Sequence, residues 1–299
     1  MERRDFINLS LAATGIAAIG YPAFSMAQNI PFIPVSGHVW VYAKNQPGFD
    51  VTPVLDQIFE DMKYAGLDGV ELMEHPLRKP VAVRNISELI SRHDIPLLGI
   101  SYGADMWDTT KHNEILDDVA LIMENMSILK ARTFGTSVGH PSGRKKTEKE
   151  LDAQALLLKK LIASGQKKGI VLNLHNHTYE VENNLFDLKG TLKRIPDVKL
   201  GPDLNWLLRA NVNPVEFLNQ YKANIVFLHL RDQLKNGRWP ESIGEGDTNF
   251  KEIGDMLKNI HFNGDAVIEL AHEDGFTPTR PIRESLRMSR EYLRTAMGI

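Results

Sequence analysis

Short apolar runs that alternate with longer amphipathic stretches constrain the fold of this chain most. Each run is bounded by Gly, Pro, Asn or Asp, which is typical of buried strands separated by turns. The runs predict strands at His38–Ala43, Gly69–Met73, Pro96–Ser101, Ala131–Ser137, Ile170–His175, Lys199–Asp203, Ile225–Leu230 and Ala266–Leu270. The stretches between them predict helices at Thr52–Tyr64, Ile86–His93, Asn113–Leu129, Thr147–Lys168, Asn184–Arg194, Pro214–Tyr221, Phe250–Ile260 and Thr279–Met297.

This alternation indicates an α/β fold with a parallel sheet. Nearly continuous apolar strands joined by crossover helices need cover on both faces of the sheet. Eight such units within 299 residues fit a single closed (β/α)8 TIM barrel. A doubly wound nucleotide-binding fold is disfavoured, because the sequence contains neither a Gly-x-Gly-x-x-Gly turn nor a Walker loop.

Composition narrows the functions that such a barrel could have. The chain has no cysteine, which excludes a disulfide framework and a thiolate metal site. Its formal net charge of -3 provides no field that would attract nucleic acid, so we expect no nucleic-acid partner. Homo-oligomerisation stays open at this stage.

The N-terminal residues resemble a twin-arginine export signal. The pair Arg3-Arg4 is followed by Phe6 and Ile7, by an apolar run over residues 9–19, and by Ala27 as the last residue before cleavage. We therefore expect a signal peptide at 1–27, a barrel domain at 28–299 and an exported, periplasmic protein. The apolar run is shorter than the roughly 18 residues of a membrane helix, so stable membrane insertion is not expected. The alternative is a basic N-terminal tail that is not an export signal.

Polar side chains gather at the ends of the last four predicted strands. His175, Asp203, His229 and Glu269 occupy these ends, and the period-two alternation of a strand points them into the barrel. Burying two imidazoles and two carboxylates together costs several kcal/mol unless a cation balances them. A divalent metal ion resolves this, and the nitrogen and oxygen donors favour Mn, Co, Zn, Fe or Ni. Taken singly, each residue could instead be a hydrogen-bonded core group.

The order of these motifs resembles the xylose isomerase-like TIM barrel superfamily of sugar isomerases and epimerases. The resemblance runs from about His38 to the C-terminus and rests on five segments: Asn173-Leu174-His175-Asn176-His177, Asp203-Leu204-Asn205-Trp206, Leu228-His229-Leu230-Arg231-Asp232, Gly244-Glu245-Gly246-Asp247 and Val267-Ile268-Glu269. It implies that His175, Asp203, His229 and Glu269 hold the metal. This chain departs from the family at His175, where the epimerases have a glutamate that acts as one of two bases. The His-Asn-His run is more similar to the inosose dehydratase-like branch.

The resemblance implies a small-molecule sugar or keto sugar as substrate and proton transfer through an enediolate. Glu269 is then the expected base, His177 a second proton carrier or a hydroxyl ligand, and Arg231 a clamp for the oxyanion or a hydroxyl. Asp232 is expected either to orient Arg231 or His229 or to form a surface salt bridge. Residues at the earlier strand ends, and Trp206, are expected to bind the sugar: Glu71, Tyr102, His140 and Trp206.

Three functions stay open at the level of sequence. The first is a metal-dependent sugar isomerase or epimerase, and the second is a metal-dependent lyase or dehydratase that acts on a keto sugar or 3-keto glycoside. Both begin with the same proton abstraction, so the metal ligands do not separate them. The third is an exported sugar-binding barrel without catalytic activity.

Overall fold

Eight parallel strands form the centre of the protein in a computed structural model that describes residues 32–299. The predicted signal peptide at 1–27 lies outside the described residues. The strands are β1 (Val35–His38), β2 (Gly69–Met73), β3 (Leu97–Gly103), β4 (Thr133–Ser137), β5 (Val171–Leu174), β6 (Lys199–Leu200), β7 (Phe227–Leu230) and β8 (Asp265–Ile268).

The strands close into a barrel. They pair in the order β6-β5-β4-β3-β2-β1-β8-β7, and every ladder is parallel. Single bridges from Leu200 to Ile225 and from Asp203 to His229 connect the two ends of this order. The second bridge joins two of the predicted metal ligands, so the closure of the barrel and the assembly of the site depend on the same contact.

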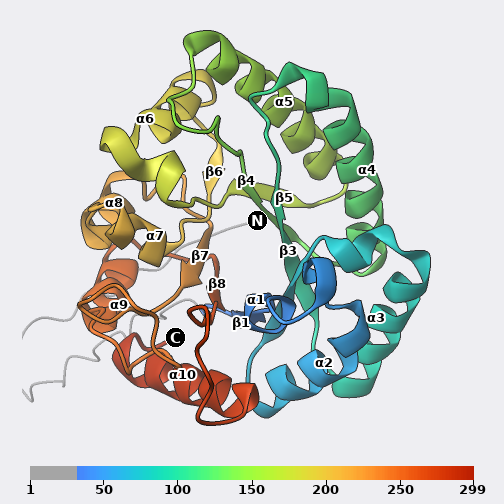
Figure 1. The fold of residues 1–299 in the computed structure, drawn as a ribbon, viewed down its shortest axis with the longest axis vertical. Coiled ribbons are helices and arrows are strands. Elements are labelled where there is room, and N and C mark those ends of the chain that lie inside the picture. The colour runs from blue at the N-terminus through green and yellow to red at the C-terminus, as the bar shows by residue number, and fades with distance from the viewer. Residues whose placement is uncertain (1–31) are drawn as a thin grey trace, which may run out of the picture. The chain divides into compact units, whose positions relative to one another are not determined.

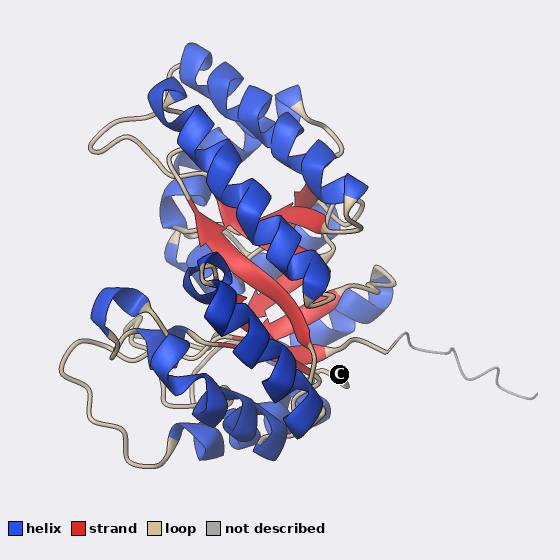
Figure 2. Cartoon of the chain, turned by 90° about the vertical axis from the view of Figure 1, so that its right-hand side faces the viewer, coloured by secondary structure: helices blue, strands red, loops and turns tan. Residues whose placement is uncertain are grey.

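Helices surround the strands, as Figures 1 and 2 show. They are α1 (Trp40–Ala43), α2 (Leu55–Tyr64), α3 (Pro80–His93), α4 (His112–Ile128), α5 (Glu148–Lys167), α6 (Thr178–Arg194), α7 (Leu204–Arg209), α8 (Pro214–Gln220), α9 (Phe250–Asn259) and α10 (Ile282–Ala296). Short 3-10 turns lie at Pro47–Phe49, Thr52–Val54, His75–Arg78 and Thr109–Lys111. None of the helices within residues 32–299 is both long and apolar enough to cross a bilayer. The single (β/α)8 TIM barrel expected from the sequence is confirmed.

The prediction of the first strand was wrong by several residues. The strand runs over Val35–His38, and Trp40–Ala43 forms a helical turn instead of the rest of the strand. A short apolar run that is buried fits either conformation, so its pattern does not distinguish them. The glycine at position 37 interrupts the apolar pattern of the true strand. A glycine is needed there because β1 lies close to α2, and a Cβ would come within 2.2 Å of the Met62 sulfur. The shift places His38 at the C-terminal end of β1.

Local sequence signals explain several helix starts. Thr147 caps α5 with a capping box: its hydroxyl accepts the Glu150 N–H, while the Glu150 carboxylate accepts the Thr147 N–H at 2.7 Å. Asp203 caps α7, a helix that the sequence pattern did not predict, by accepting the N–H groups of Asn205 and Trp206 at 2.8 and 3.2 Å. The cap holds one carboxylate oxygen of Asp203 and leaves the other directed at the site.

Candidate metal centre and active site

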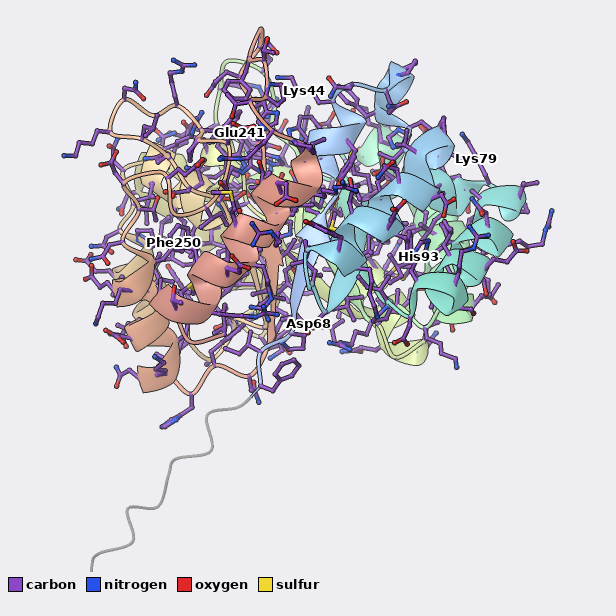
Figure 3. The ribbon with its side chains drawn as sticks, turned by 90° about the horizontal axis from the view of Figure 1, so that it is seen from below. Lys44, Asp68, Lys79, His93, Glu241 and Phe250 are labelled. Atoms are coloured by element: carbon purple, nitrogen blue, oxygen red, sulfur yellow. The ribbon has the colours of Figure 1, made fainter. Side chains whose placement is uncertain are left out.

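A cavity of about 1160 Å³ opens at the C-terminal ends of the strands. Residues at or just after the end of every one of the eight strands line it, which is where barrels of this type carry their chemistry. Figure 3 shows Lys44, which lines this cavity, at one end of the barrel and Asp68, which precedes β2, at the other end. The end marked by Lys44 is therefore the functional end.

The four predicted metal ligands lie together, and three of them, His175, His229 and Glu269, line this cavity. His175, Asp203, His229 and Glu269 each offer one donor atom, and these atoms lie within 4.8 Å of one another. All four residues are buried, and they come from the ends of four consecutive strands, β5 to β8. Two imidazoles and two carboxylates form a donor set that suits a divalent transition metal.

An unpartnered polar atom in this cluster fits a metal ion. His175 Nδ1 is buried without a hydrogen-bond partner. A buried polar group in that state is unfavourable by about 1–3 kcal/mol, and a metal–nitrogen bond would remove such a penalty. The residues present therefore fit a divalent cation.

His229 is held between two carboxylates. Its Nδ1 lies 2.6 Å from Glu269 Oε2, and its Nε2 lies 3.1 Å from Glu71 Oε2. Burial alone would lower the pKa of His229, but the negative charges of Glu71 and Glu269 raise it to about 10. Without a metal ion this ring is an imidazolium, so binding of a metal ion to it must release a proton.

Glu71 lies below the cavity. It was expected to bind the substrate, but it is fully buried, does not line the cavity, and faces His229. Histidines that bind metals usually donate their second N–H to a carboxylate or carbonyl, and that contact fixes the orientation of the ring. Glu71 is in the position to hold His229 in this way.

Arg231 joins the two carboxylate ligands. Its Nη2 pairs with Glu269 Oε1 and lies 3.3 Å from Asp203 Oδ2. Burial raises the pKa of Glu269, yet Arg231 above all, with His38 and His229, holds it well below its usual value. The pKa of Asp203 is raised, because the effect of burial exceeds the opposing effect of the nearby Arg231 charge. Glu269 is thus a carboxylate that stays ionised inside the barrel.

The two histidines after β5 have different environments. Burial, together with His229 and His177, lowers the pKa of His175 well below its usual value, so this ring is neutral and able to bind a metal. Burial also opposes protonation of His177, but Glu180 raises its pKa overall. The His177 ring lies edge-on to His175, with 5.1 Å between centroids, and its Nδ1 is 3.1 Å from the Tyr179 hydroxyl. His177 lines the cavity beside the ligand cluster.

The other predicted sugar-binding residues line the cavity walls. His140 stacks on Tyr179 with centroids 4.1 Å apart, and Trp206 meets Trp239 edge to face at 5.9 Å. Tyr102 presents its ring, while its hydroxyl donates to Asp118 at 3.2 Å. The structure therefore gathers His140, Trp206 and Tyr102 around one cavity and separates Glu71 from it.

Sequence reasoning missed His38 and Trp239. His38 Nδ1 lies 3.7 Å from Glu269 Oε1, and its Nε2 contacts the Ser101 hydroxyl at 2.8 Å. The wrong first strand put His38 at the far end of the barrel, and the correct strand boundary was the signal that would have found it. Trp239 lies in the long loop after β7, where no sequence pattern pointed to the site.

Asp232 takes neither of its two expected roles. Its carboxylate is buried and accepts four backbone N–H groups, those of Gln233, Gly244, Gly246 and Thr248, at 2.8 to 3.1 Å. The side chain thus holds the segment between β7 and α9 in shape. Neither a bond to Arg231 or His229 nor a surface salt bridge of Asp232 is found within residues 32–299.

Comparisons with known proteins agree with this architecture. Three solved structures resemble it: a sugar phosphate isomerase/epimerase from Parabacteroides distasonis (TM-score 0.70, 15% identity, 92% of this chain and 99% of that chain), 3-keto-D-glucoside 4-epimerase from E. coli (0.69, 17%, 88% and 100%) and D-psicose 3-epimerase from Clostridium cellulolyticum (0.71, 12%, 89% and 99%). At these identities the likeness shows the fold. No curated protein sequence matches the chain significantly. A family model described as xylose isomerase-like TIM barrel matches residues 59–292, and the chain belongs to this family.

Proposed function

We propose that the protein is a divalent-metal-dependent sugar isomerase or epimerase that transfers a proton next to a sugar carbonyl. The observation that carries the proposal is the buried cluster of His175, Asp203, His229 and Glu269 at a cavity large enough for a sugar. These four residues would hold the metal ion. When bound, a divalent ion of Mn, Co, Zn, Fe or Ni supplies Lewis-acid polarisation of a carbonyl and its neighbouring hydroxyl. The structures of sugar epimerases with the same fold support the substrate class.

The residues of the chain have separate roles in this proposal. Glu269 removes the proton next to the carbonyl, since its carboxylate lines the cavity within the ligand cluster. Arg231 has a buried Nε without a partner, which offers a donor to an oxygen that becomes negative in the enediolate. His177 lines the cavity beside the cluster and returns the proton. The walls formed by Tyr102, His140 and Trp206 orient the sugar ring.

A metal analysis combined with variants tests the proposed ligands. Protein purified without chelator should contain one equivalent of a divalent metal ion by elemental analysis. Asp203→Ala combined with His229→Ala should remove it, because two of four donors are lost. As a matched control, Asp247→Asn lies outside the cluster and should keep the metal. A double variant that retains a full equivalent would show that the ligands are others.

A second candidate is a lyase or dehydratase that eliminates a group from a keto sugar or 3-keto glycoside. It is favoured by the donor set, in which Glu269 lines the cavity as a carboxylate while the position at the end of β5 is the imidazole of His175. An epimerase with two opposed carboxylate bases is therefore not available from these residues. Incubation with 3-keto glycosides and manganese or cobalt separates the two: release of the aglycone supports the lyase, and interconversion of a free ketose without release supports the isomerase. Binding of either sugar without any conversion would support a non-catalytic barrel.

We also propose that the protein is exported by the twin-arginine route. The support is the sequence pattern of Arg3-Arg4 followed by Phe6, Ile7 and an apolar run. The test is cell fractionation of the full chain beside an Arg3→Lys, Arg4→Lys variant. Equal amounts of both in the exported fraction would contradict the proposal.

A further inference from the structure

We infer that the stacked pair Trp40–Phe49 is a subsite for the second ring of an uncharged glycoside, whose keto sugar reacts at the ligand cluster. This inference rests on the proposed function and names its substrate class. It follows from four observations: the size of the cavity, the aromatic pair on its wall, the link between that pair and the cluster, and the charge of the lining.

The cavity is larger than one monosaccharide requires. Pockets for drug-sized ligands usually have volumes of about 300–1,000 Å³. This cavity has about 1160 Å³ and extends over the ends of all eight strands. A single sugar ring at the metal ligands would leave part of the cavity to water.

Trp40 and Phe49 form an aromatic surface on the wall of this cavity. Their rings stack with centroids 5.4 Å apart and planes inclined by 24°. Phe49 is 45% exposed, although a phenyl ring normally lies in the core. Its backbone also has a φ of 58°, a left-handed conformation that is unfavourable for a residue with a bulky side chain. Core packing does not explain the exposed ring, whereas a ligand surface on the cavity wall does.

Trp206, Trp239 and Tyr179, three other aromatic residues of the cavity wall, already contact cationic or histidine side chains. The Arg209 and Arg231 guanidinium groups lie over the rings of Trp239 and Trp206 at 4.3 to 5.3 Å. Tyr179 stacks on two histidine rings. Over Trp40 and Phe49, in contrast, no Lys or Arg side chain stacks anywhere within the described part of the chain. This pair is therefore an aromatic surface of the cavity that a second ligand ring can contact.

The pair is tied directly to the reacting end of the site. The backbone N–H of Trp40 donates to His38 Nδ1 at 3.1 Å. His38 Nδ1 in turn lies 3.7 Å from Glu269 Oε1. Trp40, Phe49 and Glu269 also line the same cavity, so a sugar that reaches Glu269 with its α-proton shares the cavity with the Trp40–Phe49 surface. A glycosidic substituent is the group that would extend there.

The charges of the lining disfavour a phosphate group. Besides its histidines, the lining contains one Lys and one Arg, Lys44 and Arg231, and five carboxylates. Lys44 pairs with Asp274 at 3.0 Å and donates to the His272 carbonyl at 2.5 Å, while Arg231 pairs with Glu269 and Asp203. No Lys or Arg side chain of the described lining is left to pair with a phosphate. Away from the metal ligands, a phosphate group would thus meet the carboxylates of the lining without a free Lys or Arg partner, which selects against it.

The test compares three sugars that share one keto carbon: 3-keto-D-glucose, its phenyl glycoside and its 6-phosphate. Binding is measured by titration calorimetry and turnover by exchange of the α-proton with deuterated solvent, in wild type, Phe49→Ala and Phe32→Ala. Phe32 is the matched control, since it is 72% exposed and lies outside the cavity. We expect the phenyl glycoside to bind about three- to tenfold more tightly than the free sugar, the scale of an aromatic contact, and at least about tenfold more tightly than the phosphate. Phe49→Ala should abolish the preference for the glycoside, and Phe32→Ala should keep it.

The outcomes separate this inference from the proposed function. Equal binding of glycoside and free sugar, an unchanged preference in Phe49→Ala, tight binding of the phosphate, or no binding of the glycoside would each overturn the inference. Exchange with the free sugar would then still support the proposed function. Preferential binding of the glycoside that depends on Phe49 but is accompanied by no exchange in any of the three sugars would support the subsite and contradict the proposed function.

Discussion

Removing the Asp232 carboxylate should destabilise the protein strongly, although Asp232 contacts neither the ligand cluster nor another charged side chain. One oxygen accepts the N–H groups of Gly244 and Gly246, and the other accepts those of Gln233 and Thr248. Gly246 is needed for this approach, since a Cβ there would lie 2.3 Å from the carboxylate. Asp232→Ala leaves four N–H groups without their acceptor, and each such bond to a charged group contributes about 1.5–3 kcal/mol.

The total loss in unfolding free energy is smaller than the sum of four such hydrogen bonds, because the segment after β7 relaxes and water reaches some of its N–H groups. We expect a loss of about 3–6 kcal/mol in the free energy of unfolding for Asp232→Ala. Asp232→Asn should lose about half of this, because the amide keeps one acceptor oxygen and turns an NH2 group toward two N–H donors. For a protein of this size, 1 kcal/mol corresponds to about 2–4 °C in Tm, so the alanine variant should melt at least about 6 °C lower.

Thermal and urea denaturation followed by circular dichroism measure these differences. Asp247→Asn is the matched control: Asp247 lies in the same segment but accepts one backbone N–H, that of Lys235 at 2.8 Å, and an asparagine can still accept it. This variant should stay within about 0.5 kcal/mol of wild type. If Asp232→Ala melted within one or two degrees of Asp247→Asn, the four bonds would not hold the segment and the reasoning would be refuted.

Three further predictions concern the base, the helix cap and the core. Glu269→Gln keeps the side-chain volume but removes basicity, so α-proton exchange should fall by about two to four powers of ten while metal content changes little; near-normal exchange would transfer the role of base to His177 or His175. The Glu150 carboxylate has its pKa lowered to about 2, chiefly by its bond to Arg144, so its stabilising effect is complete above about pH 4.5 and is lost as the pH falls toward 2. The difference in unfolding free energy between wild type and Glu150→Gln should therefore be below about 1 kcal/mol at pH 7 and shrink on acidification, and urea denaturation at several pH values would contradict this if the difference grew toward low pH. Phe134→Ala removes a fully buried ring and should lower the unfolding free energy by about 3–5 kcal/mol, as chemical denaturation would show; a loss below about 1 kcal/mol would mean that the core closes over the gap.

Much of the architecture was readable in the sequence because its signals are local. Strand and helix periods, together with the absence of nucleotide-binding loops, led to a single (β/α)8 barrel, and the helix predicted at Thr147–Lys168 is found as α5 at Glu148–Lys167. The candidate ligands could also be read, since a polar residue at the end of an apolar strand is unusual and the barrel brings strand ends together. The structure accordingly gathers all four of them in one cluster.

Contacts between residues far apart in the chain were decided only by the tertiary structure. β1 pairs with β8 because the barrel closes, and this brings His38 to Glu269. The same closure turns Glu71 toward His229, below the cavity, where a strand-end position had indicated a residue that contacts the sugar. The short apolar run after His38 fitted a strand and a helix equally well, and burial against the rest of the barrel made it a helix. Sequence patterns record the spacing of residues along one element, whereas the partners of a buried charge depend on how the elements curve together, and that curvature belongs to the closed barrel as a whole.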